Sequence, residues 1–287
     1  MILIADSGST RTEWYVLRKG HPGIQLETIG FNPYFTKPET IHDSIDKDLT
    51  PFFYPDKVEE LYFYGAGVGL ESNRDKIADI LKDHFENADI EVMTDMLGAA
   101  RAIFGNGSGI ACILGTGSNA CIFENGKITY QPPSLGYILG DEGGGVHLGK
   151  ALLTAYIRRT LPEDLREKFL LKYKKDETTI VESIYRLPGP NAFIAGFTPF
   201  LTENIDHPFI GNIIEESFRA FFKSNLFPTD SNAEMQYGFA GSVAFHFKEF
   251  LIKTMMGLSL KPGPIIASPI EGLVHYHNKE EFPLLFQ

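Results

Sequence analysis

Residues 2–17 (ILIADSGSTRTEWYVL) decide the fold that this sequence predicts. Two runs of this segment, 2–5 and 12–17, have the composition of β-strands, and the polar turn between them contains Gly8. Residues 109–123 (GIACILGTGSNACIF) repeat this plan around a second turn. Glycine and small hydroxyl residues let backbone N–H groups approach an anion closely. One such turn is typical of an ordinary hairpin, whereas two favour a duplicated architecture with two phosphate-binding turns across a cleft.

The composition limits the partners that the chain could have. It has 287 residues, enough for two modest domains or a single large one with an ample core. Its formal net charge of −11, without a basic stripe, argues against nucleic acid and against an anionic membrane. Too few residues precede Asp6 for a secretory signal, and no apolar run has the length of a membrane span. We therefore expect a cytoplasmic protein.

The cysteines and histidines do not predict a metal cluster. Cys112 and Cys121 lie in the predicted strands on either side of the second turn. A cross-strand disulfide is one interpretation, and buried free thiols are the one that we favour. The histidines lack metal-ligand spacing, and neither a P-loop nor a nucleophile elbow is present.

The first third of the chain predicts a mixed sheet with helices on its faces. The pattern indicates strands at 2–5, 12–17, 25–30, 60–64 and 90–93, and helices at 39–49, 73–85 and 95–104. After a glycine-rich stretch at 105–109, which we interpret as a hinge, strands are predicted at 109–114, 119–123 and 127–130. Asn125 and Gly126 form a strong type I′ turn signal. Hairpin-linked strands followed by crossovers indicate an α/β fold.

The remainder of the chain is predicted to be mostly helical at first. A long helical region at 145–225 is broken near Pro162, Pro188 to Pro190, and Pro208. A strand at 235–240, a helix at 243–256, strands near 259–261 and 264–267, and a final helix from 269 follow.

The first turn has the residue types that a phosphate and metal site needs. Asp6 ends a buried strand, and Mg²⁺ prefers one or two carboxylates together with water and phosphate oxygens. The hydroxyls and backbone N–H groups of the turn can hold the β- and γ-phosphates of a nucleotide. The candidate phosphate-binding residues here are Ser7, Gly8, Ser9, Thr10 and Thr12. The alternative interpretation makes Asp6 a turn or Asx-capping residue.

Two further junctions could contact a nucleotide. The second turn offers Gly115, Thr116, Gly117 and Ser118 to phosphate. Asn119 adds a side-chain amide that suits a sugar or hydroxyl group. Gly241 and Ser242, between a predicted strand and helix, would present a helix N-terminus.

Asp95 is the candidate general base. It follows the strand at 90–93 directly and opens a helix for which Thr94 is the predicted N-cap. A carboxylate at the C-terminal end of a strand points into the crevice where open α/β sheets bind ligands. There it can take a proton from an attacking hydroxyl group. The alternative is a helix-terminal carboxylate that the helix dipole favours.

The assembled motifs resemble those of the sugar kinase/Hsp70/actin superfamily, and within it the N-acetylglucosamine kinase-like branch of the BadF/BadG/BcrA/BcrD ATPase family. DSGST at 6–10 is similar to the first phosphate motif, GTGSN at 115–119 to the second, and 238–244 to the adenosine motif. Asp95 in TDMLGAA matches the catalytic aspartate of the branch. Asn32, Asn119 and Asp141 match positions that contact the sugar. The segment before the adenosine motif departs from the pattern and leaves the base contacts unassigned.

The resemblance implies two ribonuclease H-like lobes, 1–106 and 107–268, around a central nucleotide and sugar cleft. A C-terminal helix at about 269–287 would pack back on the first lobe. The implied activity is an ATP-dependent kinase with Mg²⁺ as cofactor, held through Asp6. It would phosphorylate an amino sugar on its 6-hydroxyl, with Asp95 as the base. ATP and the sugar would be its partners, and a homodimer is the assembly to consider. The sugar stays open among N-acetylglucosamine, glucosamine and N-acetylmuramic acid.

Two other functions stay open at this point. A dehydratase activator of the same family holds an iron–sulfur cluster between subunits with two cysteines from each. Cys112 and Cys121 give that number, but they flank a phosphate turn on strands and not at exposed helix ends. The other alternative is a sugar sensor of the same fold without catalysis, against which Asp95 in its strand–helix setting argues.

Overall fold

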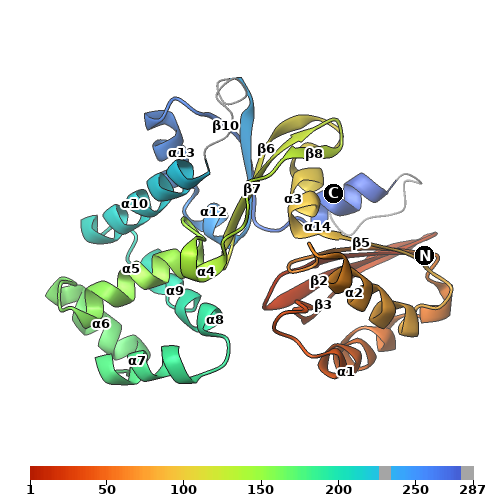
Figure 1. Cartoon of the computed structure of the whole chain (residues 1–287), viewed down its shortest axis with the longest axis horizontal. Coiled ribbons are helices and arrows are strands. Elements are labelled where there is room, and N and C mark those ends of the chain that lie inside the picture. The colour runs from red at the N-terminus through yellow and green to blue at the C-terminus, as the bar shows by residue number, and fades with distance from the viewer. Residues whose placement is uncertain (226–233, 279–287) are drawn as a thin grey trace. The chain divides into compact units, whose positions relative to one another are not determined.

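The computed structural model describes residues 1–225 and 234–278, which form two compact units (Figure 1). Among these residues, unit 1 contains 1–107, 124–128 and 268–278, and unit 2 contains 108–123, 129–225 and 234–267. Within the described residues, no helix combines the length and the apolar character that a membrane span requires.

Unit 1 is built on a mixed five-stranded sheet of order β3-β2-β1-β4-β5. Its strands are β1 (Ile2–Ser7), β2 (Arg11–Arg18), β3 (His21–Ile29), β4 (Glu60–Gly65) and β5 (Asp89–Thr94). The first three pair antiparallel, and β1, β4 and β5 pair parallel, which confirms the predicted mixed sheet. β3 starts earlier than predicted, because Pro22 lies on an edge strand where its missing N–H costs little.

Helices cover both faces of this sheet. They are α1 (Pro38–Asp48), α2 (Glu71–His84), α3 (Asp95–Phe104) and α14 (Ile270–His277), with short 3₁₀ helices at Thr50–Phe52 and Pro55–Lys57. Figure 1 shows α1 and α2 on one face and α3 and α14 on the other. Alternate strand residues supply the two cores: Leu3 and Trp14 pack with the first pair of helices, and Ile4 and Tyr15 with α14. The last part of the predicted C-terminal helix, 279–287, lies outside the described residues.

Unit 2 repeats the strand order of unit 1. Its strands are β6 (Ser108–Leu114), β7 (Ser118–Glu124), β8 (Lys127–Tyr130), β9 (Gln236–Ala240) and β10 (Lys261–Ile266), arranged β10-β9-β6-β7-β8. Counted from its own first strand, each sheet has the order third, second, first, fourth, fifth. The duplicated α/β architecture expected from the two turns is therefore confirmed. Asn125 and Gly126 have φ values of 51° and 80°, as a type I′ turn requires.

The helices of unit 2 differ from the prediction in their breaks. They are α4 (Gly136–Leu139), α5 (Gly145–Ile157), α6 (Glu163–Tyr173), α7 (Glu177–Arg186), α8 (Pro190–Ala195), α9 (Thr198–Glu203), α10 (Pro208–Ser224), α12 (Ser242–His246) and α13 (Lys248–Gly257). α6 ends before Lys174, whose backbone has a left-handed conformation, and no proline in the sequence marks this break. The helix predicted at 243–256 is interrupted at Phe247. The two strands predicted at 259–261 and 264–267 are one edge strand, β10, which tolerates Pro262 and Pro264.

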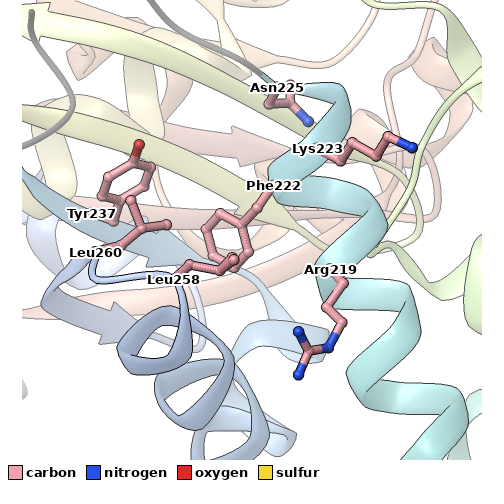
Figure 2. A pocket seen from close by; sticks show the side chains of 7 residues that line it. All are labelled: Arg219, Phe222, Lys223, Asn225, Tyr237, Leu258 and Leu260. Carbon is pink, nitrogen blue, oxygen red and sulfur yellow. The ribbon is translucent and has the colours of Figure 1, made fainter. Parts of the chain in front are cut away.

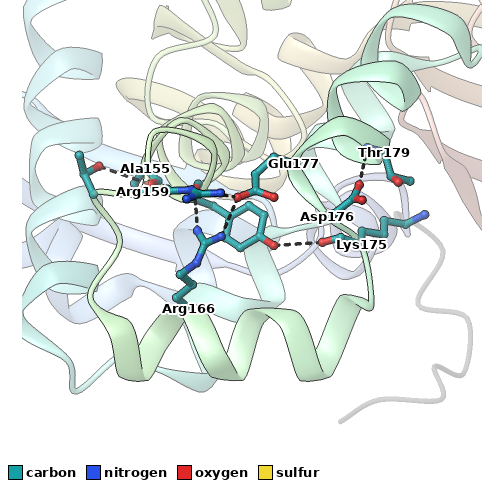
Figure 3. Close-up of polar contacts among 9 residues, drawn as sticks. Ala155, Arg159, Arg166, Lys175, Asp176, Glu177 and Thr179 are labelled. Atoms are coloured by element: carbon teal, nitrogen blue, oxygen red, sulfur yellow. Dashed lines mark hydrogen bonds and ion pairs between the residues drawn. The ribbon is translucent and has the colours of Figure 1, made fainter.

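Polar contacts fix α7 against α5 and α6 (Figure 3). The Arg166 guanidinium donates to the Glu177 carboxylate at 2.6 Å and to the Tyr156 carbonyl at 2.9 Å. It also lies 4.7 Å from the centroid of the Tyr156 ring, whose hydroxyl donates to the Lys175 carbonyl at 3.1 Å. One arginine therefore joins the start of α7 to the end of α5.

The two cysteines are buried free thiols, as we favoured from the sequence. Cys112 lies on β6 and Cys121 on β7. Burial raises the pKa of both thiols, that of Cys121 to about 12. Both side chains are therefore protonated core residues at neutral pH.

The contact between α14 and α3 gives a prediction about stability. A Cβ at Gly272 would lie 2.4 Å from the Ala102 carbonyl oxygen. We therefore expect Gly272→Ala to lower the free energy of unfolding by about 1–3 kcal/mol, because the helices must separate. Urea denaturation followed by circular dichroism measures this. Gly69→Ala, with open space around its Cβ, is the matched control, and an equal loss in both variants would contradict the close approach.

Candidate active site

The strand register of unit 1 brings two distant carboxylates to one edge of the sheet. Ser7 pairs with Gly65, and Gly65 pairs with Thr94, in the parallel alignment of β1, β4 and β5. Asp6 and Asp95 therefore both lie where these strands end. The charge of Asp95 is among the influences that raise the pKa of Asp6, in keeping with their proximity.

Asp95 is the first residue of α3. The Thr94 hydroxyl accepts a hydrogen bond from the Leu97 N–H at 3.3 Å, which confirms the predicted cap. The Asp95 Oδ1 atom accepts one from the Met96 N–H at 2.8 Å. Burial nevertheless raises the pKa of Asp95 to about 6. A carboxyl group with a pKa in this range can accept a proton near neutral pH.

The carboxyl group of Asp6 is surrounded by more negative than positive charge. Its pKa is raised to about 8 by burial first, then by Glu13 and Asp95, and the positive charge of Arg11 opposes this. A divalent cation would relieve the surplus. The donor set fits Mg²⁺, which binds few carboxylates and keeps several waters. Among the residues described, no three His, Cys, Asp or Glu side chains converge to enclose a metal by themselves.

Two hydroxyls of the first turn are used inside the protein. The Ser7 and Thr12 hydroxyls are buried and lie 2.7 Å apart. Ser7 Oγ also accepts from the Phe31 N–H at 3.0 Å, and Thr12 donates to the Ile29 carbonyl at 2.8 Å. They fasten the hairpin to the segment that follows β3.

The other residues of the first turn are more open. Gly8 and Thr10 are exposed, and Ser9 is half-buried. The turn packs closely on Gly30, where a Cβ would lie 2.5 Å from the Gly8 carbonyl oxygen. The turn is therefore held in place by the backbone at Gly30, whose N–H also donates to the Thr10 carbonyl at 3.1 Å.

Asn32 contacts this turn directly. Its amide nitrogen donates to the Ser9 hydroxyl at 3.0 Å, and its amide oxygen accepts from the Tyr34 N–H at 3.1 Å. Gly67 also approaches it, because a Cβ there would lie 2.5 Å from the Asn32 amide oxygen. The structure thus brings the sugar-binding candidate of unit 1 together with its phosphate-binding candidates.

The second turn is braced by the start of α5. Gly145 N–H donates to the Gly115 carbonyl at 2.8 Å, and Val146 N–H to the Thr116 carbonyl at 2.9 Å. A Cβ at Gly144 would lie 2.6 Å from the backbone of Gly117. Glycine is therefore required where the glycine-rich loop meets the turn.

Asp141 lies against this second turn. Its Oδ1 atom accepts from the Ser118 N–H at 3.1 Å, and a Cβ at Gly117 would lie 2.6 Å from its Oδ2 atom. Asp141 has a φ of 59°, a left-handed conformation that side chains other than glycine rarely adopt. Burial raises the pKa of its carboxyl group, and the Ser118 hydrogen bond and the Lys150 charge oppose this.

The last candidates of unit 2 also lie near the end of β6. Gly241 has a φ of 121°, and a Cβ there would lie 2.4 Å from the Leu114 carbonyl oxygen. The exposed Ser242 follows it at the start of α12. Asn119, half-buried on β7, accepts at its amide oxygen from the Ala120 N–H at 2.9 Å and from Gln131 at 3.3 Å.

A pocket of about 280 Å³ lies apart from these candidates (Figure 2). It includes Tyr237, near the start of β9, whereas Gly241 follows the end of that strand. Its lining residues are Arg219, Phe222, Lys223, Asn225, Tyr237, Leu258 and Leu260. None of them belongs to the site predicted from the sequence.

Glu13 is a neighbour of Asp6 that the sequence prediction did not include among its candidates. It pairs with Asp6 across β1 and β2 and helps to raise the pKa of Asp6. Arg11 contacts the Glu13 carboxylate at 2.8 Å, and the Ser268 hydroxyl donates to its other oxygen. Because β1 and β2 are antiparallel strands joined by the first turn, counting residues in both directions from that turn would have paired Asp6 with Glu13.

No protein-family model matches the chain, and no curated protein is significantly similar to it. Solved structures are similar. One, from Porphyromonas gingivalis, is provisionally described as an N-acetylglucosamine kinase; it is 38% identical, with 98% of this chain and 100% of that chain covered, and a TM-score of 0.91.

Two more distant structures have the same fold. A protein of Chromobacterium violaceum, also provisionally described as an N-acetylglucosamine kinase, is 16% identical, with 96% and 98% of the two chains covered and a TM-score of 0.68. A ROK family glucokinase from Streptomyces griseus, solved with glucose and AMPPNP, is 14% identical, with 96% and 97% covered and a TM-score of 0.55. At these identities the likeness concerns the two-lobe sugar kinase fold.

The charge around Asp6 predicts a coupling between protons and Mg²⁺. We expect added Mg²⁺ to lower the pKa of Asp6 from about 8 to below neutrality, because the cation and the proton compete for one carboxylate. Carboxyl ¹³C NMR between about pH 5 and about pH 9 measures this. A carboxyl that titrates near its ordinary value of 3.8 and ignores Mg²⁺ would contradict the assignment.

The same pKa has a consequence for stability without Mg²⁺. The folded state binds this proton more tightly than the unfolded chain, so the contribution of the proton to stability is lost as pH rises through about 8. Asp6→Asn should remove this part of the pH dependence and serves as the control for both titrations.

Proposed function

This chain belongs to the same family as the Porphyromonas gingivalis protein, and from this premise we propose that it is an ATP-dependent sugar kinase that acts on an amino sugar. We propose N-acetylglucosamine or a close analogue as the substrate, its 6-hydroxyl as the acceptor and Mg²⁺ as the cofactor. The observation that carries the proposal is the pair of carboxylates, Asp6 and Asp95, beside the first glycine-rich turn. Phosphoryl transfer requires a base for the acceptor and an anchor for the phosphate-bound cation.

Asp95 is the proposed base. Its carboxylate takes the proton of the sugar 6-hydroxyl while the hydroxyl oxygen forms a bond to the γ-phosphorus of ATP. The bond from that phosphorus to the bridging oxygen of the β-phosphate breaks, and ADP leaves with the electron pair. A pKa of about 6 leaves Asp95 mostly ionised at neutral pH. The Met96 N–H holds one carboxylate oxygen, so the other is available to the sugar.

Asp6 is the proposed anchor of the cation. When bound there, Mg²⁺ supplies positive charge to the phosphate oxygens. The exposed Thr10 and the Ser9 hydroxyl contact phosphate in this proposal, whereas the Gly8 N–H already donates to the Arg11 carbonyl at 3.0 Å. We assign Ser7 and Thr12 to shaping the turn, because their buried hydroxyls already bond to each other.

Unit 2 supplies further nucleotide contacts in this proposal. Its candidates surround the end of β6: Gly115, Thr116, Gly117 and Ser118 in the turn, and Gly241 and Ser242 after β9. The close approach of Gly241 to the Leu114 carbonyl supports this grouping, because a side chain would close the space beside the turn. The N–H groups of Gly115, Ser118 and Gly241 already donate within the protein, so the proposed phosphate donors are the N–H groups of Thr116, Gly117 and Ser242.

Three polar residues are the proposed sugar contacts: Asn32 in unit 1, and Asn119 and Asp141 in unit 2. Asn32 supports a link between sugar and phosphate, since its amide already contacts Ser9. Asp141 is held by the Ser118 N–H in the same way. Amide and carboxylate groups are suited to sugar hydroxyls.

The buried cysteines argue against the dehydratase activator. An iron–sulfur cluster shared between subunits needs thiolates at the protein surface. Cys112 and Cys121 are fully buried on strands and protonated at neutral pH. A purified protein with iron and the absorbance of a cluster would restore that alternative.

We expect Asp95→Asn to lower kcat about 10²–10⁴-fold while the affinities for sugar and nucleotide change little, because the amide keeps the size but cannot accept the proton. Steady-state kinetics and calorimetry measure the two effects. The wild-type kcat should also fall below about pH 6 as Asp95 protonates. Asp89→Asn, at the exposed start of β5, is the control. A variant that retains a third or more of the wild-type kcat would exclude Asp95 as the base.

The substrate is tested by ADP release with N-acetylglucosamine, glucosamine, N-acetylmuramic acid and glucose. We expect the highest kcat/KM with an N-acetylated amino sugar, and ³¹P NMR should place the phosphate on its 6-oxygen. The 6-deoxy sugar is the matched control, which should bind without turnover. Tight binding of every sugar with no ADP release would instead identify a sensor.

A further inference from the structure

Lys150 of unit 2 contacts the loop that carries Asp141, one of the proposed sugar contacts. It is half-buried on α5, and its Nζ atom donates to the Tyr137 carbonyl at 2.9 Å. Tyr137 belongs to the single turn of α4, which ends directly before Gly140 and Asp141. A lysine side chain of one helix therefore holds the segment that leads into a candidate site residue.

The α4 turn buries little apolar surface. Leu135, Ile138 and Leu139 are exposed, whereas Tyr137 packs, partly buried, against the core of unit 2. The last carbonyls of a helix lack amide partners within it, and a lysine ammonium group can satisfy one of them. Lys150 thus supplies a polar contact where apolar packing is small.

The geometry of Asp141 depends on the position of this turn. Its backbone φ of 59° is left-handed, and its Oδ1 atom accepts from the Ser118 N–H at 3.1 Å. Its carbonyl accepts from the Gly144 N–H at 3.1 Å. A side chain other than glycine stays in the left-handed region only where its surroundings hold it there. The turn before Asp141 is part of those surroundings.

Lys150 also acts on Asp141 through its charge. Burial is the largest influence on the pKa of Asp141 and raises it. The Ser118 N–H and the Lys150 charge lower this pKa, and Glu142 raises it further. The pKa of His147, on α5, is lowered first by burial and then by Lys150, against the effect of Glu142. Lys150 therefore favours the ionised form of Asp141.

We propose that Lys150 is a positioning residue for Asp141, which it holds through the Tyr137 carbonyl so that the carboxylate accepts hydrogen bonds from sugar hydroxyls. This inference rests on the proposed function, in which Asp141 contacts the sugar. An ionised carboxylate only accepts hydrogen bonds, whereas its protonated form also presents a donor. Lys150 acts through Asp141 and need not touch the sugar or the nucleotide.

Substitutions of Lys150 separate its charge and its hydrogen bond from its packing. Lys150→Met keeps the aliphatic chain and removes the donor and the charge, whereas Lys150→Arg keeps both. Lys168→Met is the matched control, because Lys168 is exposed on α6 and donates to the Asn204 side chain at 3.2 Å. Lys150→Gln, which retains a donor without the charge, replaces Lys150→Met if that variant fails to fold.

Carboxyl ¹³C NMR of the sugar-free protein gives a first readout that does not depend on kinase activity. Asp141→Asn identifies the signal of Asp141. We expect the pKa of Asp141 to be higher in Lys150→Met than in the wild type, and to return toward the wild-type value in Lys150→Arg. An Asp141 pKa that is equal in the wild type and Lys150→Met would overturn the proposal.

Sugar affinity gives the second readout. In calorimetry with N-acetylglucosamine at neutral pH, Lys150→Met should bind about tenfold more weakly, while Lys150→Arg and Lys168→Met bind nearly as the wild type does. The same loss should raise KM about tenfold and leave kcat nearly unchanged, because it affects the ground state and the transition state alike. The affinity should also fall as the pH falls and Asp141 protonates, and should do so at a higher pH in Lys150→Met.

The outcomes distinguish this proposal from the proposed function. Equal affinities of the wild type and Lys150→Met, in an enzyme that releases ADP, would overturn the role of Lys150 and leave the kinase activity intact. Binding that Lys150→Arg weakens as much as Lys150→Met does would overturn it as well. A wild type that binds none of the sugars would instead contradict the proposed function, and the NMR titration would then decide whether Lys150 acts on Asp141.

Discussion

The parallel pairing of β1, β4 and β5 is the constraint on which the candidate site of unit 1 depends. Ser7, Gly65 and Thr94 occupy one row across these strands, so the residues around that row meet at one edge although the chain separates them widely. A shift of one residue would turn every side chain of a strand to the opposite face and would also bury the wrong residues. The two apolar cores on either side of the sheet therefore fix the register, and the register places the carboxylates.

In unit 2 the strand register likewise brings together residues that are distant in the sequence, but here it aligns backbone segments and not carboxylates. Ile113 pairs with Ala240, and Ala240 with Ile266, so the second turn and Gly241 follow neighbouring strand ends. A Cβ at Gly241 would approach Leu114 to 2.4 Å, which shows how little space separates these backbones. The repeated strand order thus places Asp6 and Asp95 at one edge of the unit 1 sheet, and the second turn with Gly241 at the corresponding edge of the unit 2 sheet.

Short sequence patterns predicted the structural features that depend on neighbouring residues. The Thr94 cap, the Asn125–Gly126 turn and the duplicated α/β architecture follow from short patterns, and all are confirmed. The break of α6 at Lys174 was not predicted, because neither proline nor glycine marks it in the sequence. Composition likewise could not distinguish the two serine hydroxyls of the turn. Ser7 is buried against Thr12 and the Phe31 N–H, whereas the half-buried Ser9 accepts from the Asn32 amide.

The two carboxylates at the edge of unit 1 differ because their surroundings differ. Asp95 accepts an N–H from the start of its own helix, which limits the effect of burial and leaves its pKa at about 6. Burial raises the pKa of Asp6 to about 8, and the charges of Glu13 and Asp95 add to this effect. Each carboxylate therefore suits a different role in the proposed transfer. Asp95, with one oxygen held by the Met96 N–H, suits the proposed base, and Asp6, beside the negative charges of Glu13 and Asp95, suits the proposed anchor of the cation.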